Sequence, residues 1–255
     1  MRIAYILGAR RNNVWMAPMI AARWQIGQRR RVPHGEGTPL RLHLGCGPTV
    51  VPGWLNLDRS PSVLLSRAPR LRWALGKVGL LTSAQVEGFP RGAIRADLTK
   101  GIPYPTGSVE YIYTSHMVEH LSRWQALALL RECMRTLTPS GLIRCAVPDL
   151  RQLAASYLDG QMTSSGTLAA DAFMVALNPR TEIEANAVQR FVWRNISGAQ
   201  HQWMYDAESL SAMFEEAGFS TVRVSGYQES AMPDIDLLEM RPESVFVEAS
   251  KSPSR

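Results

Sequence analysis

Long apolar runs and cysteines are both scarce in this 255-residue chain. No uncharged stretch approaches the roughly 18 residues that a membrane-spanning helix needs, so a transmembrane protein is not expected. The three cysteines form neither a CxxC pair nor a zinc-ligand spacing, and their odd number argues against a disulfide scaffold. This usage fits a reducing compartment, and we expect a cytoplasmic location.

Acidic residues are nearly absent from the first 38 positions. The segment holds seven arginines and one acid, Glu36, so its net charge of +6 equals that of the whole chain. We therefore predict that residues 1–38 form a basic arm, which is either a solvated leader or a peripheral contact with an anionic membrane. No small-residue cleavage site is present, so the arm is expected to be retained. Its basic residues are not interleaved with aromatic ones, and no nucleic-acid partner is expected.

The regular pattern begins after the arm, and residues 39–255 are predicted to be one α/β domain. Apolar segments typical of strands alternate with helical stripes, which favours a mainly parallel sheet with helices on both faces. One helix is expected over Leu121–Leu137, stopped by Pro139 and Gly141, and another from an N-cap at Asp206 to Gly218. The predicted strands are Leu40–Gly45, Trp54–Asp58, Ile94–Leu98, Val109–Thr114, Leu142–Val147, Phe219–Val224 and Ser244–Ala249.

Two segments are predicted to be insertions. Residues 60–93 are apolar with interspersed Arg67, Arg70, Arg72 and Lys77, which suits either a lipid-linked or phosphorylated ligand or a plain amphipathic packing helix. Residues 150–200 have a helical pattern with several aromatic side chains, which suits either a lid or additional core.

Small and acidic residues stand at the ends of the first three predicted strands. Gly45 and Gly47 follow the first strand, where the lack of a Cβ lets a ligand approach the backbone. Asp58 ends the second strand, where a carboxylate can accept both ribose hydroxyls of an adenosyl group. Asp97 and Leu98 end the third, where an acid can accept from the adenine amino group while the leucine packs on its ring. Each feature alone is weak, but the three occur in order at the edge where such sheets bind ligands.

The runs LHLGCGPTVVPGWLNLD, ADLTKGIPYPTGSVEYIYTSHMVEHL and LLRECMRTLTPSGLIRCAVPDL resemble class I S-adenosylmethionine methyltransferases. They look closest to a bacterial branch found among surface-polysaccharide genes. The resemblance implies a Rossmann-like, seven-stranded, mainly parallel sheet with an antiparallel last strand, and S-adenosylmethionine as cofactor. The cofactor-binding residues expected from it are Leu44, Gly45, Cys46, Gly47, Asp58, Asp97, Leu98, Ser115 and His116.

Two departures from that family pattern stand near the glycines. Thr49 replaces the third glycine of the usual GxGxG, and only Pro48–Gly53 separates the first two strands. A parallel crossover normally needs a dozen or more residues. Either the usual first helix is reduced to a turn, or one strand is wrongly predicted.

The segment His116–His120, HMVEH, allows three interpretations. As HxxEH on a helix it matches the inverted zinc-peptidase motif, with Glu182 or Glu184 as a distant ligand. Alternatively, Glu119 and His120 fix the loop-to-helix junction by hydrogen bonds, while His116 lies near the cofactor. We favour the structural role of Glu119 and His120 and the position of His116 near the cofactor, and we assign no metal ligands.

The methyl acceptor is expected to be an oxygen of a sugar, glycolipid or related small metabolite, as the polysaccharide branch implies. A histidine of near-neutral pKa is the natural base for a hydroxyl acceptor, and His116 is the first candidate, with His201 and Asp149 after it. If the acceptor is a carboxylate, no base is needed and all three become binding residues. The competing interpretation is a non-catalytic, S-adenosylmethionine-binding scaffold of a glycan-assembly system.

Overall fold

A computed structural model describes residues 40–60, 62–81, 91–160, 168–177 and 200–251. The chain divides into two units, Met1–Gly35 and Glu36–Arg255, and the first lies outside the described residues. The basic arm over residues 1–38 therefore stays a prediction. Within the described part, no helix combines the length and the apolar character that a membrane crossing requires.

The domain is built on one seven-stranded sheet with the order β3-β2-β1-β4-β5-β7-β6. Only β7 runs antiparallel to its neighbours, β5 and β6, so the predicted mainly parallel sheet with an antiparallel last strand is confirmed. The strands are β1 (Leu40–Leu44), β2 (Leu55–Asp58), β3 (Ile94–Arg95), β4 (Val109–Ser115), β5 (Leu137–Pro148), β6 (Thr221–Ser225) and β7 (Ser244–Ser250).

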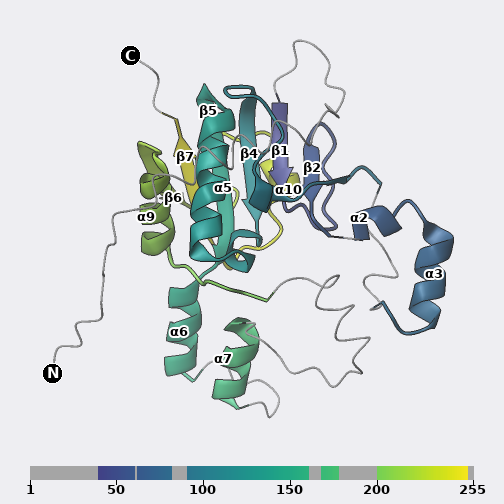
Figure 1. Cartoon of the computed structure of the whole chain (residues 1–255). Helices are drawn as coiled ribbons and strands as arrows, with labels where there is room; N and C mark the ends of the chain where they lie inside the picture. Colours follow the sequence, from purple (N-terminus) through teal and green to yellow (C-terminus); the bar gives the residue numbers. More distant parts are fainter. Residues whose placement is uncertain (1–39, 61, 82–90, 161–167, 178–199, 252–255) are drawn as a thin grey trace. The chain divides into compact units, whose positions relative to one another are not determined.

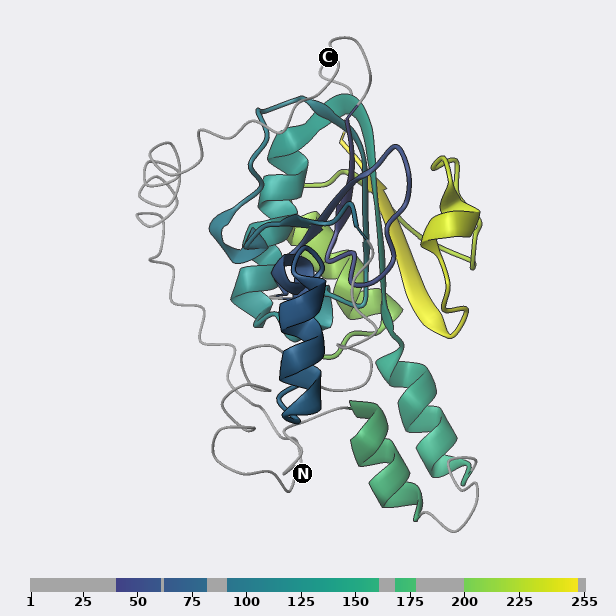
Figure 2. The same ribbon diagram turned by 90° about the vertical axis from the view of Figure 1, so that its right-hand side faces the viewer.

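Helices cover both faces of this sheet (Figures 1 and 2). Helices α5 (Arg123–Thr136) and α9 (Ala207–Ala217) lie on one face, and the short α10 (Ile235–Leu238) lies on the other. The side chains of β4 alternate between the two layers as a pleated strand requires. Ile112 packs in the core with α5 and α9, whereas Tyr113 packs with Trp54 and Leu238.

Local signals set the ends of α9 as predicted. The Asp206 carboxylate accepts a hydrogen bond from the Ser209 N–H at 2.8 Å, and Gly218 closes the helix in the left-handed conformation. The end of α5 agrees with its prediction to within one residue. The helix stops at Thr136, and Pro139 and Gly141 lie inside β5, which begins at once at Leu137.

Strands β1 and β2 are parallel neighbours although no helix joins them. The register pairs Leu42 with Leu55 and Leu44 with Leu57, and Gly45–Trp54 form only turns. Both predicted strands are therefore correct, and the usual first helix is reduced to a turn. Strand β3 is shorter than predicted, because Asp97 already caps the 3-10 turn η1 (Leu98–Lys100).

The described parts of both insertions are helical. Residues 60–93 contain α2 (Ser62–Leu65) and α3 (Pro69–Lys77), and no residue of α3 is buried. Residues 150–200 contain α6 (Leu150–Leu158) and α7 (Ala169–Leu177). The aromatic rings of Tyr157 and Phe173 stack between these two helices with centroids 5.0 Å apart.

Candidate active site

The turn after β1 packs directly against the end of β2. The N–H groups of Gly45 and Cys46 both donate to the Leu57 carbonyl, at 2.8 and 3.1 Å. The Gly47 N–H donates to the Asp58 carboxylate at 3.0 Å, and the Ser60 N–H donates to its other oxygen at 2.6 Å. Gly45 and Gly47 both have positive φ, +65° and +52°, a conformation that glycine adopts without steric cost. The turn thus fixes the Asp58 carboxylate at the strand end.

Asn56, which the sequence analysis did not single out, holds the short β1–β2 connection in place. Its buried side chain accepts from the Val51 N–H at 3.1 Å and donates to the carbonyls of Val51 and Trp54, at 3.0 and 2.9 Å. The His43 ring lies 3.2 Å from the same amide oxygen. These bonds satisfy backbone groups that a helix would otherwise pair. In the sequence, the signal that could have identified Asn56 was a polar residue between Leu55 and Leu57 of a buried strand.

Asp97 stands beyond the next strand, close to Asp58 along the sheet edge. The register pairs Asp58 with Arg95, and the Asp58 carbonyl accepts from the Ala96 N–H at 2.9 Å. Burial alone would raise the pKa of Asp97, but hydrogen bonds from Thr99 and the nearby Lys100 charge outweigh it and lower that pKa. Asp97 is therefore an ionised hydrogen-bond acceptor at neutral pH.

The other predicted cofactor residues contribute differently. The Leu44 and Leu98 side chains belong to the core, and Cys46 is buried against Val63 and Ala93. Burial raises the pKa of the Cys46 thiol to about 12, so this thiol is neither a nucleophile nor a metal ligand at neutral pH. Leu44, Cys46 and Leu98 can therefore contact a cofactor only through their backbone groups or the exposed edges of their side chains.

At the end of β4 the chain turns sharply through His116. This residue has a φ of +49°, which is uncommon for a residue other than glycine. Its Nε2 lies 2.9 Å from the Ser244 hydroxyl and its Nδ1 lies 3.3 Å from a Glu119 carboxylate oxygen. Ser244 begins β7, and the antiparallel register with β5 brings it to this edge. A strained backbone held by such partners is a feature of functional sites.

His116 also lines a cavity of about 440 Å³ at the carboxyl ends of β4 and β5. Asp149, the N-cap of α6, lies in the same cavity and accepts from the Arg151 N–H at 2.8 Å. Polar groups from the segment before β7 complete the wall, with Arg241 and Glu243 beside Ser244. The structure therefore brings two of the three predicted catalytic residues to one cavity.

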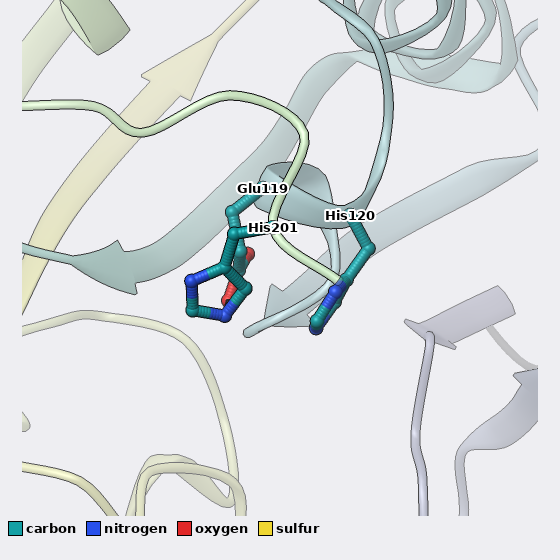
Figure 3. A group of neighbouring side chains, drawn as sticks. All are labelled: Glu119, His120 and His201. Carbon is teal, nitrogen blue, oxygen red and sulfur yellow. Dashed lines mark ion pairs between the residues drawn. The ribbon is translucent and has the colours of Figure 1, made fainter. Parts of the chain in front are cut away.

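His201, the third predicted catalytic residue, lies on the other side of Glu119. Its Nε2 is 4.0 Å from the same carboxylate oxygen that faces His116. Burial lowers the pKa of His201, and the Glu119 charge opposes that shift in part. Figure 3 shows Glu119, His120 and His201 gathered side by side, from the 3-10 turn η2 (Val118–His120) and from the segment before α9.

The HMVEH segment differs from its prediction in one respect. His116 and His120 do not share a helix face, because the helical turn of this segment is the three-residue η2. The arrangement required by the inverted peptidase motif is thus not formed, and Glu182 and Glu184 lie outside the described residues. The backbone carbonyls of Glu119 and His120 do accept hydrogen bonds that hold the junction. Their side chains do not contribute: within the described part of the chain, the two Glu119 oxygens and His120 Nδ1 have no hydrogen-bond partner.

One known domain family matches more than half of this chain. A family model described as a methyltransferase domain matches residues 64–224. Curated proteins give no significant match. Among solved structures, PigF with SAH is similar at 16% identity and a TM-score of 0.42, covering 92% of this chain and 61% of that chain.

Two further solved structures are similar at the same level. The S-adenosylmethionine-dependent methyltransferase SibL has 18% identity and a TM-score of 0.41, with 85% of this chain and 51% of that chain covered. A SAM-dependent methyltransferase of Thermotoga maritima has 13% identity and a TM-score of 0.44, with 84% and 83% covered. This chain thus spans about half to three fifths of the length of PigF and SibL. Because the family model matches more than half of its residues, the chain belongs to the methyltransferase-domain family.

Proposed function

We propose that this chain transfers a methyl group from S-adenosylmethionine to an oxygen of a sugar, glycolipid or related small metabolite. One observation carries the proposal. The Gly45–Gly47 turn holds the Asp58 carboxylate at the same sheet edge on which His116 and Asp149 line a cavity. Parallel sheets bind their ligands at this edge.

The residues at the ends of β1 to β3 fit the proposed cofactor. Each Asp58 oxygen accepts one backbone N–H and keeps a lone pair with which to accept a ribose hydroxyl. Beside it, a Cβ at Gly47 would meet no atom within 4 Å, so the backbone there faces open space. Asp97 is the acceptor for the adenine amino group. The cofactor supplies a methyl group made electrophilic by its sulfonium sulfur.

His116 is the proposed base for a hydroxyl acceptor. With Nδ1 facing the Glu119 carboxylate, the proton belongs on Nδ1 and Nε2 is left as the accepting nitrogen. That nitrogen meets the Ser244 hydroxyl at 2.9 Å, beside the cavity. An acceptor hydroxyl that takes the place of Ser244 gives its proton to Nε2. Asp149 then orients a second hydroxyl of the same acceptor.

The polar side chains on the cavity wall, His116, Asp149 and Glu243 among them, support an acceptor with hydroxyl groups, and α3 supports an anionic or lipid-linked one. Leu71 and Trp73 are 53% and 62% exposed on α3, next to Arg70 and Lys77. An exposed helix with apolar and basic residues suits an anionic lipid surface. The basic arm, residues 1–38, is proposed to contribute to the same contact.

The test is calorimetric titration of the full chain with S-adenosylmethionine and S-adenosylhomocysteine. We expect micromolar binding that is lost in Asp58→Ala and kept in Asp159→Ala, a control at the exposed end of α6. Failure of the folded wild-type protein to bind either compound would overturn the proposal.

Catalysis needs a separate measurement, the transfer of labelled methyl to a polysaccharide-precursor extract. His116→Gln is expected to keep cofactor affinity and to lower the transfer rate about 10²- to 10⁴-fold, the usual contribution of a general base. Cofactor binding without transfer to any extract would favour the non-catalytic scaffold instead.

A further inference from the structure

The carboxylate of Glu119 is fully buried and lacks the partners that a buried charge requires. Its side chain is 0% exposed, and among the described residues neither of its oxygens accepts a hydrogen bond. His116 and His201 approach one oxygen, at 3.3 and 4.0 Å, but without hydrogen-bond geometry. Buried carboxylates are normally hydrogen-bonded, paired or bound to a metal. A proton on one Glu119 oxygen would still leave the other oxygen without a partner.

Two imidazole rings beside Glu119 have the same deficit. Within the described part of the chain, His120 Nδ1 and His201 Nδ1 are buried without a hydrogen-bond partner, while a hydrogen bond with the Leu177 backbone acts on the His201 ring. The ring centroids of His120 and His201 are 4.9 Å apart. One nitrogen from each ring and one Glu119 oxygen all lie within 4.8 Å of one another, which Figure 3 displays.

The protein backbone fixes this grouping although its members are far apart in sequence. The N–H groups of Gln202 and Trp203 both donate to the Glu119 carbonyl, at 2.7 and 3.2 Å. The Gln202 side chain donates to the His120 carbonyl at 2.9 Å. These three bonds hold the segment that carries His201 against η2, so the cluster is a built feature of the fold.

We propose that Glu119, His120 and His201 bind a divalent transition-metal ion, with zinc the best fit. Two imidazoles and one carboxylate are a common zinc ligand set in proteins, with a fourth position left for water or a ligand oxygen. Bonds of about 2.0–2.1 Å place tetrahedral ligand atoms roughly 3.3 Å apart. The ligand atoms lie within 4.8 Å of one another, so they have to close by at most about 1.5 Å around the ion.

The ion satisfies Glu119 and both rings together, which a proton cannot do. Glu119 has a second oxygen, so it can bind the ion while still facing His116, whose ring then orients the metal-bound carboxylate. His116 connects the metal site to the cavity that it lines. The metal site does not depend on the proposed methyl transfer, and it departs from our sequence analysis, which assigned no metal ligands.

The experiment is titration of the chelator-treated full chain with zinc, followed by Co²⁺ substitution. We expect one zinc per chain, a higher unfolding temperature with zinc, and the visible absorption bands of tetrahedral Co²⁺. Glu119→Gln and His201→Ala should each weaken zinc binding at least about tenfold, the lower range for loss of support around a metal. Circular dichroism of the metal-free variants verifies that they are folded.

Asp159→Ala, at the exposed end of α6, is the control and should bind one zinc with unchanged affinity. His116→Gln separates this site from an HxxEH site, because His116 supports Glu119 but is not a ligand. It should keep one zinc per chain with weaker binding, whereas an HxxEH site would lose the ion. Absence of zinc binding by the folded wild type would overturn the proposal, as would equal binding by all variants. Both outcomes are independent of the S-adenosylmethionine titration, so the two proposals fail separately.

Discussion

Replacement of Gly45 by alanine tests the close packing of the β1–β2 turn. A Cβ at this position would lie 2.4 Å from Met117 Cγ and 2.6 Å from Met117 Cβ. The positive φ of +65° adds a backbone cost of about 1–2 kcal/mol for a residue with a Cβ. The overlap with Met117 adds about 1–3 kcal/mol, as overpacking in a filled core does. We therefore expect Gly45→Ala to lower the free energy of unfolding by about 2–5 kcal/mol.

Gly53→Ala separates the two contributions. Gly53 belongs to the same connection and has a φ of +79°, but its Cβ would meet no atom within 4 Å. It should cost only the backbone part, about 1–2 kcal/mol. Urea unfolding of both variants, followed by fluorescence and circular dichroism, gives the difference.

The double variant Gly45→Ala with Met117→Gly completes a mutant cycle, since it removes both Met117 atoms that the new Cβ would overlap, Cγ at 2.4 Å and Cβ at 2.6 Å. The two changes should couple by about 0.5–3 kcal/mol, with the double variant more stable than additivity predicts. Two outcomes would contradict this reasoning: Gly45→Ala lowers the free energy of unfolding no more than Gly53→Ala does, or the effects of the Gly45 and Met117 substitutions are additive. Either would show that contact with Met117 is not the reason for a glycine at position 45.

Three other substitutions test buried polar groups by urea unfolding. Arg144, 0% exposed, pairs with Glu239 and Glu248. Arg144→Leu leaves the buried Glu239 carboxylate without its charged partner, whereas Glu248 keeps Arg223. The loss should cost about 3–5 kcal/mol of unfolding free energy, and a cost under about 1 kcal/mol would contradict this. Burial lowers the pKa of His43 to about 4 from 6.5. Between pH 6.5 and pH 4 the His43 ring is therefore protonated in the unfolded chain but neutral in the folded one, and the free energy of unfolding should fall by about 3 kcal/mol over this range. His43→Gln should flatten this dependence of stability on pH. An unchanged dependence would refute the lowered pKa of His43. Asn56→Leu removes the hydrogen bonds to the β1–β2 connection and should lower the free energy of unfolding by about 2–4 kcal/mol. It should also weaken S-adenosylmethionine binding. An unchanged affinity in calorimetry would show that the connection does not shape the cofactor site.

Segments with a clear local pattern were predictable from the sequence. Strand β4 has alternating side chains that face two different layers, and the alternation of Ile112 and Tyr113 is visible in the sequence itself. The ends of α9 were also predictable, because capping by Asp206 and Gly218 involves only neighbouring residues. Both signals act within a few residues.

Predictions failed where long-range pairing overrides a local preference. Strand β5 begins at Leu137 and not at the predicted Leu142, because Leu137 pairs with Val109 of β4 before the register shifts at the stretch that holds Pro139 and Gly141. The helical spacing of His116 and His120 suggested a shared helix face, but His116 is held at the end of β4 by Ser244 and the Ala146 carbonyl.

The sequence by itself determined the class of fold, the order of its elements and the strand ends at which ligand-binding residues stand, since periodicity and caps are local properties. Only the tertiary structure decided which side chains meet there. The antiparallel register of β5 and β7 brings Ser244 to His116, and backbone bonds to Glu119 bring His201 to His120. Such contacts join residues about eighty or more positions apart, and whether a buried polar atom has a partner becomes known only when every neighbour is in place.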